Sequence, residues 1–480
     1  MLGSRFNTPY LPACKYTDTY SRLQQESPNA SKTSKVHYLL PASNVKAPLC
    51  AAAASALINR YPIPTIVGYK GEGEYDAHKA HIAKLRVISR YLHQFKKEEE
   101  DDLVLIVDGF DVLAQAPAEH MIEQYFKLMQ QADQKLADSY SITVDEAHNR
   151  GLRQTILWGT DKGCFPMRMD EPQCWLIPNS DLPRYVFGPQ TGRGDLPFSD
   201  SKFLNSGTVI GPLGDLRDLM DGVLQFIGDT WDKDDKYHNS DQLYISKTYA
   251  RQEYHRLLNR TDGQFSDPEG RKLPDEKKYT SRRSEYHITV DFDSTFTQTQ
   301  CHNEPFIHKL HYDKLENQAL VEMDLFEEGK TFRSYNVRLP SSFYLSMLRL
   351  WNEIPEDDVD KSEMSAQEWF RTLRIGTNVA TKKQYAFYHN TCSKEHFVDR
   401  HRDCWYFNYI KPLLRTAIKA HKANENINSR PIDGRNWKPA QEYPEDSTND
   451  EFGGVFTDHE TEEFIPYSEF CKESLSEVLG

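Results

Sequence analysis

Apolar residues in the first part of the chain follow two different spacings. Short apolar runs predict buried strands, and longer segments with apolar residues three or four positions apart predict helices. In chain order the pattern predicts strand, helix, strand, helix and strand over Val36–Leu40, Ala47–Asn59, Pro64–Tyr69, Ala77–Phe95 and Leu103–Val107. The last run is apolar on both faces, as central parallel strands are. We therefore expect a doubly wound α/β sheet whose ligands bind beyond the carboxyl ends of its strands.

The pattern continues less regularly beyond this unit. It predicts a helix, a strand, the end of another strand and two more helices over Ala118–Leu136, Thr155–Trp158, Val209–Gly211 and residues 214–228 and 238–251. Later segments are expected to form an exposed loop, a mainly helical insertion and a long helix, over Thr261–Ser284, residues 305–385 and Phe397–His421.

These elements divide the chain into four segments. Residues 1–34 are polar and carry no periodicity, which is typical of a disordered lead-in. Residues 35–300 are expected to form the α/β core, and residues 301–421 a helical annex that completes it. Residues 422–480 become polar and then acidic, which predicts a flexible tail.

Charge and hydropathy exclude two classes of partner. The 480 residues carry a formal charge of −14, whereas nucleic-acid binding depends on clustered Lys and Arg, so no nucleic acid is expected. The most apolar stretch, Ala47–Ile58, is shorter than the roughly 20 residues of a transmembrane helix, so no membrane span is expected. The sequence after Met1 lacks a signal-peptide pattern, which predicts either a cytosolic protein or a targeting segment outside this chain.

The cysteine spacing gives a different indication of compartment. The eight cysteines contain no Cys-x-x-Cys pair, so a structural zinc site is not expected. Two pairs are close in sequence and are predicted to form disulfides: Cys164 with Cys174, and Cys392 with Cys404. With the glycosylation sequons at Asn29 and Asn259, these pairs favour a lumenal protein.

The strongest local signal for chemistry is the segment from Ile106 to Val112, where a buried strand ends in Asp108 and Asp111. Carboxylates at this position suit Mn²⁺ or Mg²⁺, and such a cation can bridge the two phosphates of a nucleotide-sugar. It then stabilises the negative charge on the departing diphosphate. A turn with capping aspartates explains the same residues. Both interpretations are open at this point.

The segment LVLIVDGFDVLAQAP resembles a strand of the glycosyltransferase domain of procollagen lysyl hydroxylases and related fungal proteins, which ends in Asp-Ser-Tyr-Asp-Val. The resemblance extends over roughly residues 36–300 and a further piece near residue 389. It implies a GT-A-type, Rossmann-like fold with Asp108 and Asp111 as metal ligands and Phe110 against the uracil of a UDP-sugar. The helix around Lys84 is similar to the family's Gln-Lys-Val-Arg segment, which implies a place for Lys84 in the nucleotide pocket, although an ordinary solvated lysine explains it equally well.

Further segments follow in the family's order. Phe203–Gly207 resembles its Leu-Asn-Ser-Gly turn, which implies that Asn205 contacts sugar hydroxyls. Asn239–Tyr244 resembles its Asp-Asp-Gln-Leu-Phe signature, which implies that Asp241 contacts the transferred sugar or stabilises its transition state, with Gln242 alongside. Asp291–Ser294 resembles the core strand that follows. Asp161, at the end of another predicted strand, is expected to line the donor pocket, although a turn or helix cap explains it as well.

A third metal ligand is expected from a histidine. The family's His-Gly-Asn-Gly segment has its nearest counterpart at His389, without either glycine, and His308 and His311 are competitors. Lys394 is expected to neutralise the diphosphate. A lone histidine is more often structural than a ligand, so this assignment stays open.

The sequence therefore predicts a metal-dependent glycosyltransferase that moves a hexose from a UDP-sugar to a hydroxyl on a protein or glycan, with Mn²⁺ as the cation. Two alternatives use the same aspartates: a metal-dependent nucleotide-sugar phosphohydrolase, and a catalytically silent module that binds sugar nucleotides. The resemblance, the sequons and the cysteine pairs favour the lumen of the Golgi or endoplasmic reticulum, although no signal or anchor is visible.

Overall fold

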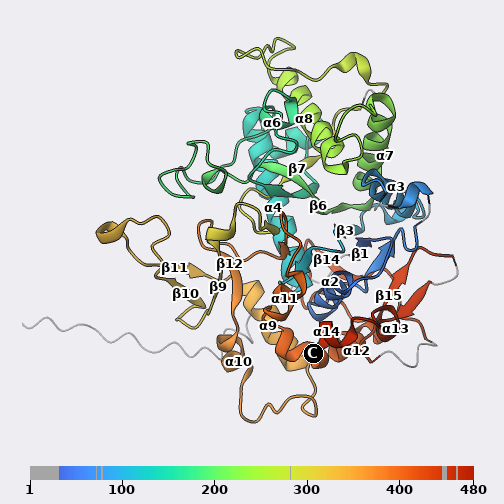
Figure 1. Cartoon of the computed structure of the whole chain (residues 1–480), viewed down its shortest axis with the longest axis vertical. Helices are drawn as coiled ribbons and strands as arrows, with labels where there is room; N and C mark the ends of the chain where they lie inside the picture. The colour runs from blue at the N-terminus through green and yellow to red at the C-terminus, as the bar shows by residue number, and fades with distance from the viewer. Residues whose placement is uncertain (1–31, 72, 77–78, 282, 446–450, 461–462) are drawn as a thin grey trace, which may run out of the picture.

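The computed structural model describes residues 32–71, 73–76, 79–281, 283–445, 451–460 and 463–480. Within these residues the central sheet has nine strands in the order β16-β15-β2-β1-β3-β6-β5-β7, with β14 beside the first half of β1 (Figure 1). Most pairs are parallel, and the antiparallel ones are β3–β6, β5–β6 and β15–β16. The strands are β1 (Lys32–Pro41), β2 (Thr65–Val67), β3 (Leu103–Val107), β5 (Ile156–Asp161), β6 (Phe203–Pro212), β7 (Ile288–Val290), β14 (Arg435–Pro439), β15 (Gly454–Thr457) and β16 (Phe464–Pro466).

Helices cover both faces of this sheet, which confirms the predicted α/β class. All of β3 is buried, and its side chains alternate between two hydrophobic cores. Leu105 and Val107 join the core with α2 and α4, whereas Val104 and Ile106 join the core with α3, α7 and α8. These helices are α2 (Ala47–Ile58), α3 (Ile82–Leu92), α4 (Ala118–Ser139), α7 (Leu213–Thr230) and α8 (Asp241–Arg260).

The C-terminal segment, predicted as a flexible acidic tail over residues 422–480, is ordered wherever the structure describes it. It supplies β14, β15 and β16 together with the helices α13 (Tyr467–Phe470) and α14 (Leu475–Leu479). Strand β15 pairs in parallel with β2, and a disulfide joins Cys471 to Cys50 on α2. The prediction was wrong because α2 is buried on nearly all sides. The residues next to it in sequence do not bury all of these sides, and the C-terminal segment packs on the rest.

The cover of α2 comes from three helices late in the chain, α11 (Phe397–Arg402), α12 (Ile410–Lys422) and α14. Figure 1 shows α12 and α14 beside α2. The long helix expected over Phe397–His421 is thus two helices, interrupted after Asp403. Residues 32–34, predicted as part of the lead-in, already belong to β1, and residues 1–31 lie outside the described ones.

The segment expected to be a helical annex, residues 301–421, contains five short strands as well as helices, and one of these strands pairs with strands outside the segment. A three-stranded sheet is formed by β4 (Val112–Ala114), β13 (Phe387–His389) and β8 (Thr297–Thr299). Two strand pairs lie beyond it, β9 (Ile307–Leu310) with β12 (Ile375–Asn378) and β10 (Gln318–Val321) with β11 (Tyr335–Arg338). The helices here are α9 (Ser341–Glu353) and α10 (Ala366–Thr372), followed by α11 and α12. Strands of three or four residues are too short to show a period in the sequence.

Cysteine pairing agrees with the sequence at one position and differs at another. Cys164 and Cys174 form the predicted disulfide, with a Cα–Cα distance of 5.4 Å. The prediction for Cys392 and Cys404 was wrong, because Cys392 bonds to Cys301 and Cys404 is a free thiol. The sequon at Asn29 lies outside the described residues. Among the residues that are described, no helix is long and apolar enough to cross a membrane.

Three buried histidines predict how stability depends on pH. Burial lowers the pKa of His120 to about 3, and the pKa values of His401 and His421 to about 4. The unfolded chain therefore binds protons that the folded protein excludes, and stability falls as pH drops from about 6.5 towards 4. Each histidine contributes a loss of about 1.4 kcal/mol per pH unit. In denaturant titrations from pH 7.5 to 5, His120→Gln should show a shallower fall than the wild type, and parallel curves would contradict this origin.

Candidate metal centre

The centre begins where β3 ends. Asp108 follows the last residue of β3, and its backbone N–H donates to the carbonyl of Gly207 on the neighbouring β6 at 2.8 Å. After a tight turn Asp111 comes immediately before β4. Asp111 is 2% exposed, whereas the side chain of Asp108 is 30% exposed. Two carboxylates thus lie at the carboxyl end of a buried strand, where open α/β sheets bind ligands.

His389 reaches this point through the small sheet of β4, β13 and β8. It pairs with Val112 of β4 on one side and with Thr299 of β8 on the other. Its Nε2 atom lies 3.5 Å from Oδ2 of Asp111. Asp108, Asp111 and His389 each offer one ligand atom, and these atoms all lie within 4.8 Å of one another.

The competing histidines lie elsewhere. His308 faces the carbonyl of Pro305, with its Nε2 atom at 3.0 Å, and His311 is exposed. Neither belongs to the group of potential ligands at this centre.

A glycine on β6 makes room for the histidine. A Cβ atom placed on Gly207 would overlap the imidazole ring of His389. The segment Phe203–Gly207, expected to be a turn, lies within β6 instead, so the glycine serves a close approach between strands and not a turn. Glycine in a strand often marks such an approach.

Two lysines hold the carboxylates. Lys84 on α3 contacts Asp108 at 2.7 Å and Asp241 at 3.0 Å, and it also donates to the carbonyl of Ser206 at 2.8 Å. Lys394 contacts Asp111 at 2.8 Å, and its side chain is 67% exposed. Lys84 is therefore an internal ion-pair partner, and not the solvated lysine that was the alternative interpretation.

Burial and charge oppose each other in the pKa values of these groups. Burial raises the pKa of Asp111, but His389 and Lys394 outweigh this effect and lower it to about 2. Burial raises the pKa of Asp108, which Lys84 only partly offsets. Burial lowers the pKa of His389, but the neighbouring aspartates outweigh it, so the net shift is upward. A site with shifts in opposite directions is typical of functional centres.

The residues predicted to contact the sugar form a connected group beside these ligands. Asp241 is the first residue of α8, and the Ser240 hydroxyl caps this helix by accepting from the backbone N–H of Leu243. Asn205 on β6 donates to Asp161 Oδ2 at 2.8 Å, and Gln242 also hydrogen-bonds to Asp161.

Phe110, the residue expected to stack on a uracil, lies between the two aspartates in the sequence. Its side chain is half-buried and packs against the core that contains α2. The other residues assigned to the cation, the nucleotide or the sugar lie in or beside this centre, whereas His308 and His311 do not.

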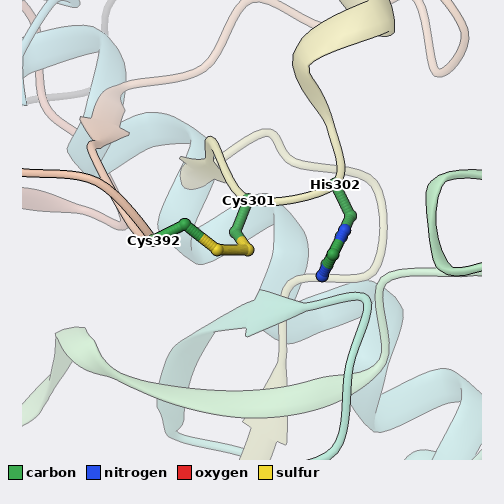
Figure 2. Close-up of side chains that lie close together, drawn as sticks. All are labelled: Cys301, His302 and Cys392. Atoms are coloured by element: carbon green, nitrogen blue, oxygen red, sulfur yellow. A yellow bond between two sulfur atoms is a disulfide. The ribbon is translucent and has the colours of Figure 1, made fainter.

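Sequence reasoning missed a disulfide that holds the edge of the centre. Cys301 follows β8 and Cys392 follows β13, and their bond spans 91 residues of sequence (Figure 2). It fastens the segment between His389 and Lys394 to the neighbouring strand. Figure 2 shows His302 beside this bond, but bonded sulfur atoms are not thiolates, so these three residues are not a metal site while the disulfide is intact. Nothing in the spacing of the cysteines indicates this pairing.

The donor set fits a divalent cation. Oδ1 of Asp111 and Nδ1 of His389 are buried and have no hydrogen-bond partner among the described residues. Buried polar atoms are normally paired, so both atoms are available to a ligand. With the imidazole of His389 neutral, the form that binds a metal, the three aspartates Asp108, Asp111 and Asp241 also carry one more charge than the two lysines that contact them. The carboxylates suit Mn²⁺ or Mg²⁺, whereas the imidazole is also a common ligand of Zn²⁺ and Fe²⁺.

Comparison of the sequence with protein-family models finds no match, and comparison with curated proteins finds none either. The resemblance to the glycosyltransferase domain of procollagen lysyl hydroxylases therefore stays a prediction. The geometry of the centre is independent of it.

The close approach of Gly207 to His389 predicts a selective defect. Gly207→Ala should displace the imidazole while both aspartates stay in place, and Mn²⁺ affinity should fall by about 10- to 100-fold, as when a ligand's support is lost. Gly228→Ala on α7, where an added Cβ meets nothing within 4 Å, is the matched control. Calorimetric titration with Mn²⁺ measures both variants, and equal affinities would remove His389 from the centre.

Proposed function

We propose that this protein is a metal-dependent glycosyltransferase of the GT-A type, which moves a hexose from a UDP-sugar to a hydroxyl group on a protein or glycan. The observation that carries the proposal is the cluster of Asp108, Asp111 and His389 at the carboxyl end of β3, with unpaired buried atoms on two of its members. A cation bound there would act as a Lewis acid on a diphosphate leaving group.

The lysines support a phosphorylated ligand. Lys394 is mostly exposed and is held by Asp111, so a cation that takes over this carboxylate leaves the ammonium available for a phosphate oxygen. Lys84 is buried and contacts two carboxylates, so its role is to fix Asp108 and Asp241 in place. Phe110 supplies an aromatic face for a uracil, since stacking does not require a tyrosine hydroxyl.

The second group of polar residues supports a sugar. Asp241, Asn205, Asp161 and Gln242 place carboxylate and amide groups beside the cation ligands, and such groups hydrogen-bond sugar hydroxyls. A carboxylate there also stabilises the positive charge that develops on the sugar ring in glycosyl transfer. Asp241 is the residue assigned to this role.

The disulfides bear on the compartment in which the protein acts. Three disulfides lie within the described part of the chain, and disulfides persist in oxidising compartments. They support a lumenal site of action, in which secreted proteins and their glycans are the acceptors.

Product analysis distinguishes the proposed reaction from its alternatives. The protein is incubated with Mn²⁺ and a panel of UDP-sugars, with and without peptide and glycan acceptors. Release of UDP with a glycosylated acceptor is expected, and Asp111→Asn should abolish it because a metal ligand is lost. Release of UMP and sugar phosphate would instead identify a phosphohydrolase, and UDP binding without any product would identify a silent module. No binding of any nucleotide would overturn the proposal.

Asp241→Asn tests the sugar-side assignment. Because Asp241 faces the sugar and not the nucleotide, this variant should keep its affinity for UDP but lose transfer by about 100-fold or more. Asp234→Asn, an exposed position just before α8, is the matched control and should transfer at the wild-type rate. A loss of UDP affinity with unchanged kcat would contradict the assignment.

A further inference from the structure

A second cavity lies away from the metal centre. Its volume is about 450 Å³, and it is enclosed by α4, the last turns of α8, the end of β7 and residues 175–183. Its lining includes none of the residues assigned to the cation, the nucleotide or the sugar. Sites for small molecules in proteins typically have volumes of about 300–1,000 Å³, so this space is large enough for a ligand of its own.

The body of the cavity is apolar. Strand β7 is the last strand of the sheet, so the two faces meet at this edge and side chains from helices on both faces enclose the space. The lining contains side chains from α4, β5, β7, α8 and the connecting segment, among them Met129, Leu136, Leu157, Leu176, Tyr249 and Val290. Such a surface favours an aliphatic or aromatic body over a sugar or a nucleotide.

The wall over residues 175–183 is fixed at both ends. It follows α6 (Pro172–Trp175), which packs on α8 and contains Cys174 of the disulfide with Cys164. Lys135 of α4 holds its other end, through an ion pair with Asp181 at 2.6 Å and a hydrogen bond to the carbonyl of Asn179 at 3.3 Å. These contacts fix the wall of the cavity in place, so the cavity does not depend on a loose loop.

Two side chains in the lining have N–H groups that are not used in described hydrogen bonds. The indole N–H of Trp175 is buried and has no partner among the described residues. Arg260 is exposed, donates to the hydroxyl of Ser139 at 3.0 Å and lies 5.4 Å from the ring centre of Tyr140, but no described carboxylate is within ion-pair distance of it. Arg256 differs, because Glu253 and Glu285 both contact it. The lining also contains four carboxylates, and each already has a cation or backbone N–H groups as partners: Asp181, Glu253, Asp291 and Asp293. The groups that are still available at this cavity are thus donors, and one of them is cationic.

We propose that this cavity binds a small amphipathic acid, with its apolar body between α4 and α8 and its anionic group at Arg260. The indole N–H of Trp175 donates to an acceptor atom of the same ligand. The match is one of shape, hydrophobicity and charge: a largely apolar space, a buried neutral donor without a described partner, and an arginine at the rim that no described carboxylate pairs.

Titration of the full chain with three ligands of equal tail tests the charge. Dodecanoate, dodecanol and dodecyltrimethylammonium are added below their aggregation concentrations, and binding is followed by calorimetry and tryptophan fluorescence. Dodecanoate should bind saturably at one site, more tightly than dodecanol, and the cation should bind least. Arg260→Gln should weaken dodecanoate binding by about tenfold, the value of one charge-assisted hydrogen bond, and leave dodecanol unchanged. Arg150→Gln, an exposed position outside the cavity, is the matched control.

Filling the cavity tests the location. Ala132 is a half-buried lining residue of α4, and Ala132→Trp should abolish binding of dodecanoate and dodecanol together. If that variant unfolds, Ala132→Leu fills less space and should weaken both ligands. Binding that does not saturate, equal affinity for the three head groups, or unchanged affinity in a folded Ala132 variant would each overturn the proposal.

Discussion

The ammonium group of Lys84 is the contact on which the centre depends. It joins α3 to the end of β3 through Asp108, to the start of α8 through Asp241, and to β6 through the carbonyl of Ser206. Without it, Asp108 and Asp241 would lose their ion-pair partner. Removing one member of a buried ion pair generally costs about 3–5 kcal/mol, because the other charge stays out of water. The relative positions of these four elements are therefore set by electrostatics as much as by packing.

The second determinant of the centre is a strand that arrives late in the chain. Strand β13 follows β3 by about 280 residues, yet its pairing with β4 sets His389 beside Asp111 with the regularity of a sheet register. The disulfide between Cys301 and Cys392 and the absence of a side chain at Gly207 complete this arrangement. Strand pairing, a disulfide and the space left by a glycine thus fix the position of the His389 imidazole. Metal sites require this kind of support for their ligands.

Local sequence patterns predicted part of the fold and of the metal centre, and the parts that depend on long-range contacts were not predicted. Strand β3 was predicted with the correct first and last residues, because a short run that is apolar on both faces is typical of a central parallel strand. Asp108 and Asp111 were found because they follow a buried strand, whereas Asp241 was found only because its segment resembles a family signature. The partner of Cys392 and the role of Gly207 were not predictable, since they depend on strands too short to show a period. The ordered C-terminal segment was missed because charged residues on its exposed side concealed a few buried ones, such as Val455 and Tyr467.

The burial of α2 has a consequence for how the chain is made. This helix is complete early in translation, but Cys471, which bonds to it, follows Cys50 by 421 residues. At about 5–20 residues per second, ribosomes need roughly 20–80 s to cover that distance. Throughout this interval an alanine-rich helix has one apolar side without its native cover. The nascent chain therefore exposes this apolar side until Cys471 and the helices that pack on α2 have been synthesised.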